Sequence, residues 1–164
     1  MFAARTLRAA KVMVGVSVKD VAGSKAAMKK AIFFAQPGDK ICAIHVPRMV
    51  PEMLLSSMSD PGDASEDTLA ALTNLPSRAG AAAQQMVKEA ASAEMQALNK
   101  TIEVEYKVSA PTSDVKQGLL AACRVEGASL LVLGPGDGGK GSIPPFAASQ
   151  ASGLTVCIVR DHLR

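Results

Sequence analysis

Short apolar runs alternate along the chain with segments whose apolar residues recur at helical spacing. The runs predict strands at 12–16, 41–46, 102–108, 130–133 and 155–159. Helical spacing covers about 26–35, 77–100, 114–126 and 143–151. The run at 130–133 is wholly apolar, which is typical of a strand buried on both faces. This alternation of strands and helices favours right-handed crossovers, and so predicts an α/β domain with a doubly wound, five-stranded parallel sheet in three layers.

The ends of this pattern suggest the domain boundaries. Residues 12–160 form the predicted domain, and residues 1–11, which are basic and lack acids, are expected to be a flexible tail. Such a composition also resembles a short organellar presequence, but the first strand follows too closely to leave much to cleave. We therefore predict a cytoplasmic protein, with an organelle as the alternative. The polar, acidic segment 56–68 is expected to be a mobile loop.

Composition excludes several classes of function. The net charge is only +3 and 3% of the 164 residues are aromatic, so the chain offers neither a strongly basic surface nor a stacking platform for nucleic acid. No apolar run approaches the roughly 20 residues that cross a bilayer. The three cysteines, Cys42, Cys123 and Cys157, are far apart in apolar stretches and are predicted to be core residues rather than metal ligands.

A glycine-rich loop follows the fourth predicted strand. Five glycines fall within residues 134–141, and Ser142 follows them. Glycines allow positive φ angles and let backbone N–H groups approach a ligand closely. A serine that caps the next helix adds a helix N-terminus, which attracts anions. The loop therefore predicts a phosphate-binding site.

The same loop matches only part of a P-loop. Gly134 to Lys140 fit the first seven positions of GxxxxGK, but Gly141 stands where a Ser or Thr would hold Mg²⁺. No later strand ends in an acid that could hold the metal. His45 ends the second predicted strand with no nucleophile motif nearby, and is expected to pack or to bond a backbone group. No catalytic residue and no metal ligand is predicted.

Residues 11–160 resemble a universal stress protein domain. Three features carry the resemblance: the segment KVMVGVS at 11–17 followed by a helix, the His45–Val46 pair, and the C-terminal block 141–160. The block is the most specific of the three. In the family a Gly-Ser pair opens the last helix, and a final apolar strand ends on a basic residue at this distance.

The resemblance implies a strand order of 3-2-1-4-5, a homodimer formed through the last strand (Thr155 to Val159), and ATP or another adenine nucleotide bound at the ends of strands one and four. The crevice where strand order reverses is also the general ligand site of open α/β sheets. In this resemblance Val46 contacts the adenine and the helix start lines the phosphates. The predicted nucleotide-binding residues are Gly15, Ser17, Val46, Leu133, Gly134, Gly136, Gly138, Lys140, Gly141, Ser142 and Ile143. Lys140 is included not from the resemblance but as a cation that could neutralise a phosphate.

Three departures from the family pattern leave alternatives open. Ser17 replaces the usual aspartate, the loop from Gly134 to Gly141 is six residues shorter than the family motif, and Pro144 removes a hydroxyl and an N–H donor. The retained Gly-Ser pair favours a regulatory module that binds an adenine nucleotide, with or without Mg²⁺, and acts through dimerisation or a protein partner. The departures favour a dimer that binds no nucleotide and serves as a protein-interaction module. A weak nucleotide hydrolase is the third hypothesis.

Overall fold

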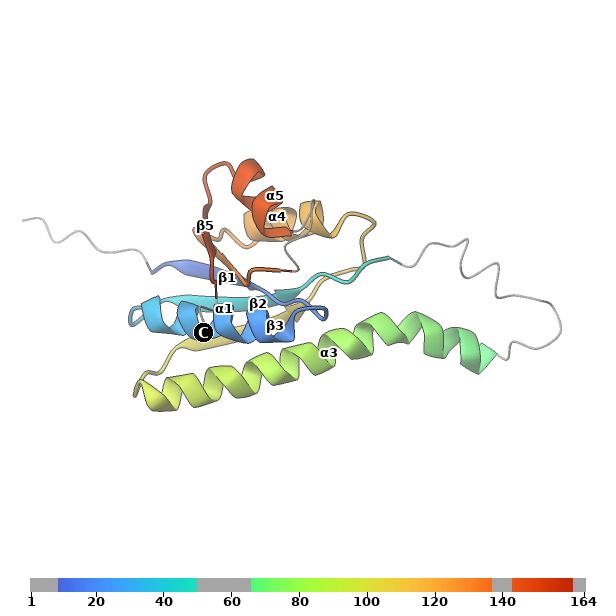
Figure 1. The fold of residues 1–164 in the computed structure, drawn as a ribbon, viewed down its shortest axis with the longest axis horizontal. Coiled ribbons are helices and arrows are strands. Elements are labelled where there is room, and N and C mark those ends of the chain that lie inside the picture. Colours follow the sequence, from blue (N-terminus) through green and yellow to red (C-terminus); the bar gives the residue numbers. More distant parts are fainter. Residues whose placement is uncertain (1–8, 50–65, 137–142, 161–164) are drawn as a thin grey trace, which may run out of the picture.

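The computed structural model describes residues 9–49, 66–136 and 143–160, and for 66–77 only the backbone (Figure 1). Strands and helices alternate as predicted. The elements are β1 (Lys11–Gly15), α1 (Val21–Phe34), β2 (Lys40–His45), α3 (Glu66–Ala97), β3 (Glu103–Val108), α4 (Val115–Val125), β4 (Leu130–Leu133), α5 (Ile143–Gln150) and β5 (Thr155–Ile158). Residues 1–8 of the predicted tail 1–11 and residues 56–65 of the predicted loop lie outside the described residues, and Lys11 already belongs to β1.

The sheet has five parallel strands in the order β3-β2-β1-β4-β5, which confirms the predicted order. The central strand β1 pairs with β2 on one side and with β4 on the other, so Val14 lies between Ala43 and Val132. The chain crosses to the other half of the sheet after β3, so the strand order reverses at the neighbouring strands β1 and β4. The carboxyl ends of these two strands diverge at this point, which positions a crevice.

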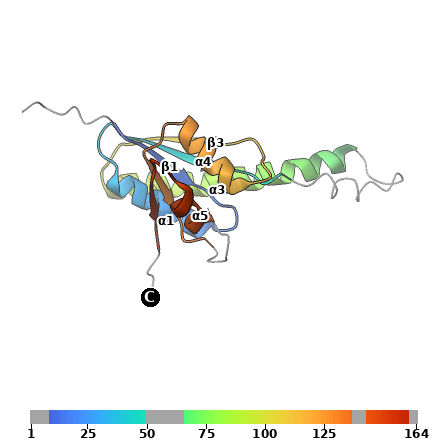
Figure 2. The ribbon, with the colours of Figure 1, turned by 90° about the horizontal axis from the view of Figure 1, so that it is seen from above.

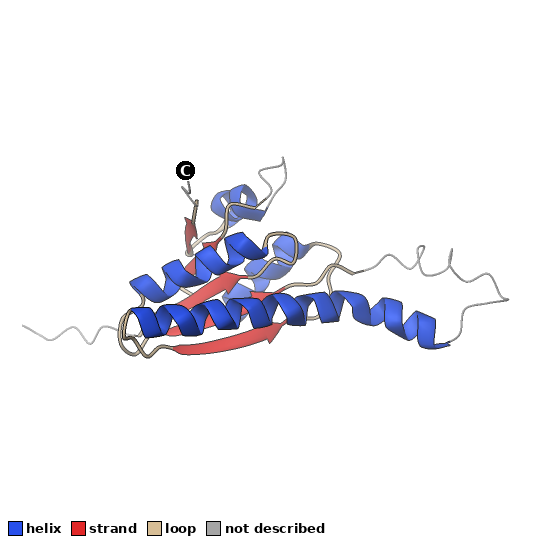
Figure 3. Ribbon diagram, turned by 60° about the horizontal axis from the view of Figure 1, so that its bottom comes forward, coloured by secondary structure: helices blue, strands red, loops and turns tan. Residues whose placement is uncertain are grey.

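Two helices cover each face of the sheet. Helices α1 and α3 lie side by side on one face, and α4 and α5 lie on the other (Figure 3). Successive residues of β1 alternate between these layers: Val14 packs under α1, and Met13 packs under α4. Both side chains are fully buried. Each face therefore has its own apolar core, as expected for a parallel sheet covered on both sides.

Helix α3 is longer than predicted. It spans Glu66–Ala97, 32 residues, so it includes the last three residues of the segment that was predicted to be a loop. At 1.5 Å per residue it measures about 48 Å, and its N-terminal part extends past the sheet (Figures 1 and 2). The predicted start at about residue 77 was wrong, because the polar and acidic composition of residues 56–68 suggested a loop, whereas the helix already begins at Glu66.

Two aspartates begin helices. The Asp114 carboxylate accepts hydrogen bonds from the backbone N–H groups of Lys116 and Gln117 at 3.0 and 3.2 Å, and so caps α4. Asp20 caps α1 by accepting from Gly23 N at 2.8 Å. Helix α1 thus begins at Val21, five residues before the predicted start, because the cap was not recognised from the sequence.

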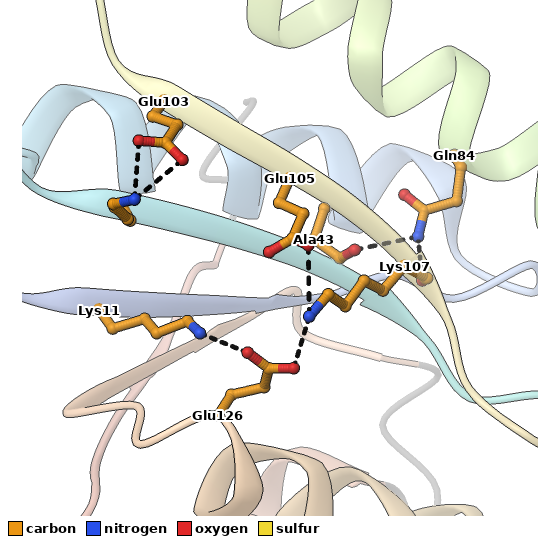
Figure 4. A network of polar contacts seen from close by, with 8 residues as sticks. Lys11, Ala43, Gln84, Glu103, Glu105, Lys107 and Glu126 are labelled. Carbon is orange, nitrogen blue, oxygen red and sulfur yellow. Dashed lines mark hydrogen bonds and ion pairs between the residues drawn. The ribbon is translucent and has the colours of Figure 1, made fainter.

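An ion network ties α4 to the sheet on the α4 side (Figure 4). Glu126, which ends α4, pairs with Lys11 of β1 and with Lys107 of β3, whose Nζ lies 2.6 Å from Oε1. Lys107 also lies 3.3 Å from Glu105. The hydrogen bonds from both lysines hold the pKa of Glu126 below its ordinary value. This network joins three elements that are distant in the sequence.

The cysteines are free thiols, and Cys42 and Cys123 are buried as predicted. Burial raises the pKa of Cys123 to about 11. No helix within the described part of the chain is long and apolar enough to span a membrane.

Candidate functional site

A cleft of about 930 Å³ opens at the carboxyl ends of β1, β2 and β4. It lies where strand order reverses, as the sequence analysis expected. The predicted site residues that line it are Gly15, Ser17, Val46, Leu133, Gly134, Gly136 and Ile143. Gly138, Lys140, Gly141 and Ser142 lie outside the described residues. Its volume is at the upper end of the range for small-molecule sites.

The loop after β1 is held by a buried serine that sequence reasoning did not single out. The backbone N–H of Ser17 donates to Ser24 Oγ at 2.9 Å, and that hydroxyl donates to the Asp20 carbonyl at 2.8 Å. Ser17 Oγ accepts from Lys19 N at 3.2 Å. The Asp20 carboxylate caps α1, so it does not occupy the position of the aspartate that Ser17 replaces. The end of β1 therefore brings the Ser17 hydroxyl to the cleft, and the nearby Asp20 carboxylate is engaged as the cap of α1.

Gly134, which lines the cleft, packs directly against the backbone of Gly23. A Cβ on Gly134 would lie 2.6–2.8 Å from backbone atoms of Gly23, in the first turn of α1. Such a distance requires the backbone to move, so packing alone demands glycine at this position. Gly136 has a φ of +68°, which also favours glycine. The first glycines of the loop thus have structural reasons independent of any phosphate.

His45 forms part of the wall at the end of β2. Its ring is 5% exposed, and Nδ1 lies 2.9 Å from the Val16 carbonyl. Because a carbonyl only accepts, Nδ1 carries the hydrogen and donates it. Gly80 of α3 packs against the ring, since a Cβ there would lie 2.5 Å from His45 Cδ2. This geometry confirms the prediction that His45 packs and bonds a backbone group.

Buried apolar side chains form the wall beyond His45. They come from β2, β4, α4 and the residues that directly follow β1 and β2, so the sheet and one helix together shape this surface. The residues are Val16, Ile44, Val46, Leu119 and Leu133. An apolar, partly flat surface of this kind suits the face of a purine or another planar ring.

Three cationic side chains line the same cleft, and none was among the predicted site residues. They are Lys19, Arg48 and Lys116. None forms an ion pair with a residue that the structure describes. The acids that line the cleft, Asp20 and Asp114, both serve as helix caps. The cleft therefore combines an apolar wall with an excess of positive charge among its described lining residues.

The backbone beyond β2 positions Arg48. Residues 47–49 run beside the segment that leads into α4: Met49 N donates to Thr112 O at 2.8 Å, and Thr112 N donates to Pro47 O at 3.1 Å. Arg48 and Thr112 form a parallel bridge. These bonds extend the β2–β3 edge and bring Arg48 to the same end of the cleft as α4. The sequence feature that could have identified Arg48 as a site residue is its position three residues after His45, which ends β2.

Within residues 9–49, 78–136 and 143–160 no group of three His, Cys, Asp or Glu side chains is placed to hold a metal ion. The starts of helices and three cations line the cleft, and the His45 ring is hydrogen-bonded to the Val16 carbonyl. The chemistry that the described residues support best is the binding of an anion attached to an apolar group.

Known structures resemble the whole fold. A universal stress protein in complex with cAMP is 21% identical with a TM-score of 0.53, over 93% of this chain and 97% of that one. A universal stress protein family protein from Arabidopsis thaliana with AMP bound is 16% identical with a TM-score of 0.58, over 94% and 93%. The hypothetical protein MJ0577 is 13% identical with a TM-score of 0.62, over 96% and 100%. The chain thus has the α/β fold of the universal stress proteins.

Comparisons at the level of sequence add nothing to this result. No protein-family model matches the chain, and no curated protein matches it.

Proposed function

We propose that this chain is a universal stress protein-like regulatory module that binds an adenine nucleotide in the cleft at the ends of β1, β2 and β4. One observation carries the proposal: an apolar wall and three cations share a cleft at the point where strand order reverses. The cAMP and AMP bound to proteins of the same fold support it. The adenine would lie against Val46 and Leu119, and the phosphates would lie toward Gly134 and the start of α5.

The proposed ligand covers the series from AMP to ATP. A ribose hydroxyl next to Ser17 would find a hydroxyl partner, which binds it more weakly than a carboxylate would. Mg²⁺ would enter with ATP, because this ion is held mainly by phosphates and water. We propose binding without turnover, since His45 Nδ1 is bonded to a carbonyl and the Asp20 and Asp114 carboxylates serve as caps.

A dimer that acts through protein interactions is the second candidate. Within the described residues, β5 pairs only with β4, so its other edge is open. Its residues Val156, Cys157 and Ile158 are each partly exposed. An open, apolar strand edge is suited to pairing with a second copy of the chain. Sedimentation at several protein concentrations tests this association independently of nucleotide.

The nucleotide proposal is tested by isothermal titration with ATP after bound ligand has been stripped. Ala79 and Ala82 are both exposed alanines on α3, but only Ala79 lines the cleft. A79E places a negative charge in the cleft, and we expect ATP affinity to fall about five-fold through charge repulsion. A82E adds the same charge to the same helix outside the cleft and should bind like the unmodified chain.

Two outcomes would contradict the proposal. If millimolar ATP, ADP and AMP all fail to bind, the adenine nucleotide is not a ligand and the dimer becomes the leading candidate. If A79E and A82E weaken binding equally, the nucleotide binds elsewhere and only the net charge of the chain matters.

A further inference from the structure

Lys116 occupies an unusual position for a lysine. It is the second residue of α4, its side chain is partly buried, and it lines the cleft. The N-terminus of a helix carries partial positive charge, so a cation in the first turn is unfavourable. No described residue forms an ion pair with Lys116. A partly buried cation at this end of a helix needs a compensating anion or another favourable contact.

The Lys116 ammonium reaches the next helix at a residue that does not itself line the cleft. Lys116 Nζ lies 5.5 Å from the centre of the Phe146 ring, which belongs to the first turns of α5. Ile143, the first residue of α5, also lines the cleft. Lys116 therefore begins at the start of α4 and reaches toward the start of α5. A negative group held at either helix start would lie within reach of this side chain.

The other two cations of the cleft are less constrained. Lys19 lies in the loop after β1 and Arg48 follows β2, and both side chains are exposed. Exposed charges are screened by water and salt, whereas a partly buried charge acts more strongly on a ligand beside it. The backbone of Lys116 is also held in place, because its N–H donates to the Asp114 carboxylate that caps α4. It is therefore the cation of this cleft best placed to set ligand preference.

We propose that Lys116 determines specificity for the phosphate chain of the nucleotide, so that the cleft prefers triphosphates to monophosphates and monophosphates to nucleosides. This inference rests on the proposed function. The ammonium would neutralise a phosphate oxygen between the starts of α4 and α5. Without a ligand the ammonium would rest against the Phe146 ring, and this cation–π attraction is modest enough for a phosphate oxygen to replace it.

The test compares ATP, AMP and adenosine by isothermal titration at low and at physiological salt. In K116Q we expect the affinity for ATP to fall about ten-fold, as for the loss of a charge-assisted hydrogen bond, and the affinity for adenosine to change less than two-fold. K116R keeps the charge and should retain most ATP affinity. K29Q removes an exposed lysine of α1, outside the cleft, and should leave all three affinities unchanged.

A structural role for Lys116 would give a different result. F146L removes the ring but keeps the ammonium, so we expect near-normal ATP binding in this variant. If F146L and K116Q weaken ATP and adenosine alike, Lys116 acts through packing against Phe146 and the inference is overturned. Thermal unfolding of each variant without ligand establishes that it folds.

The remaining outcomes separate this inference from the proposal beneath it. If the unmodified chain binds adenosine as tightly as ATP, the nucleotide proposal stands and the role of Lys116 is rejected. If K116Q binds ATP as tightly as the unmodified chain, other groups neutralise the phosphates and the role of Lys116 is rejected. If neither ATP nor adenosine binds to the unmodified chain, the proposed function and the role of Lys116 both fail.

Discussion

Two groups of cations in this chain have opposite surroundings. On the α4 side of the sheet, Lys11 and Lys107 are paired with Glu126, which joins β1, β3 and the end of α4. At the carboxyl ends of the strands, Lys19, Arg48 and Lys116 line a cleft without a carboxylate partner among the described residues. Paired charges hold elements of the fold together. Charges gathered in a cleft without such partners are available to a ligand.

The cleft that holds the second group of cations also depends on its backbone, at the contact between Gly134 and Gly23. G134A places a Cβ 2.6–2.8 Å from Gly23 backbone atoms, and these cannot move without shifting α1. We expect a loss of about 2–3 kcal/mol in the free energy of unfolding, typical of overpacking against a rigid neighbour. Urea denaturation followed by circular dichroism measures it.

G15A is the matched control, because its Cβ would meet side-chain atoms instead of backbone: a terminal methyl group of Leu133 at 2.5 Å and one of Leu119 at 3.6 Å. The Leu133 side chain can rotate, so a loss of about 1 kcal/mol is expected. Equal losses in the two variants would show that the Gly134–Gly23 contact is as adaptable as a side chain.

The ion network is tested by E126Q, which removes the negative charge shared by Lys11 and Lys107. We expect a loss of about 1 kcal/mol at pH 7, since a network of pairs exceeds a single exposed pair. Because the pKa of Glu126 is lowered in the folded state, its contribution is present above its ordinary pKa and lost as pH falls through the folded value. The difference between E126Q and the unmodified chain should therefore shrink in urea titrations at pH 3.

E103Q provides the control for that pH dependence. Glu103 pairs with Lys40 at 3.0 Å, but both side chains are more than half exposed. Removal of this charge should change the free energy of unfolding by less than about 0.5 kcal/mol at either pH. An E126Q difference that persists at pH 3 would contradict a role for the ionised carboxylate.

The sequence allowed most of the fold to be predicted, because strand periodicity and helix spacing are local signals. The resemblance on which the order of strands was based depended on a few motifs, and the structure confirms that order. Helix boundaries were harder to predict. The Asp20 cap and the N-terminal third of α3 were missed, because polar residues occur in caps, in loops and on the exposed faces of helices alike.

The predicted site residues that line the cleft all lie at the ends of strands, in the glycine loop or at the start of α5. Glycines and strand-ending residues mark the ends of β1, β2 and β4 in any sequence of this pattern. Arg48 and Lys116 were missed because their importance depends on a tertiary contact between two loops and on the meeting of α4 with α5. A lysine that follows a helix cap by two residues was nevertheless a detectable anomaly, because helix N-termini favour acids.

The smallest expected effect separates the two groups of cations without any ligand. K11Q breaks a pair with Glu126 and should lower the free energy of unfolding by about 0.5 kcal/mol. K116Q removes a cation from the N-terminal turn of α4 and should raise it by about 0.3 kcal/mol, because the charge opposes the helix dipole. Urea unfolding of the nucleotide-free variants, measured in parallel at low salt, resolves the sign.

Opposite signs would mean that Lys11 stabilises the fold and that Lys116 is kept at a cost in stability. A residue retained at such a cost is explained by an anion that reaches it only when the cleft is filled. If K116Q instead lowers stability as much as K11Q does, Lys116 belongs with the structural cations, and its contact with Phe146 would be sufficient reason for its presence.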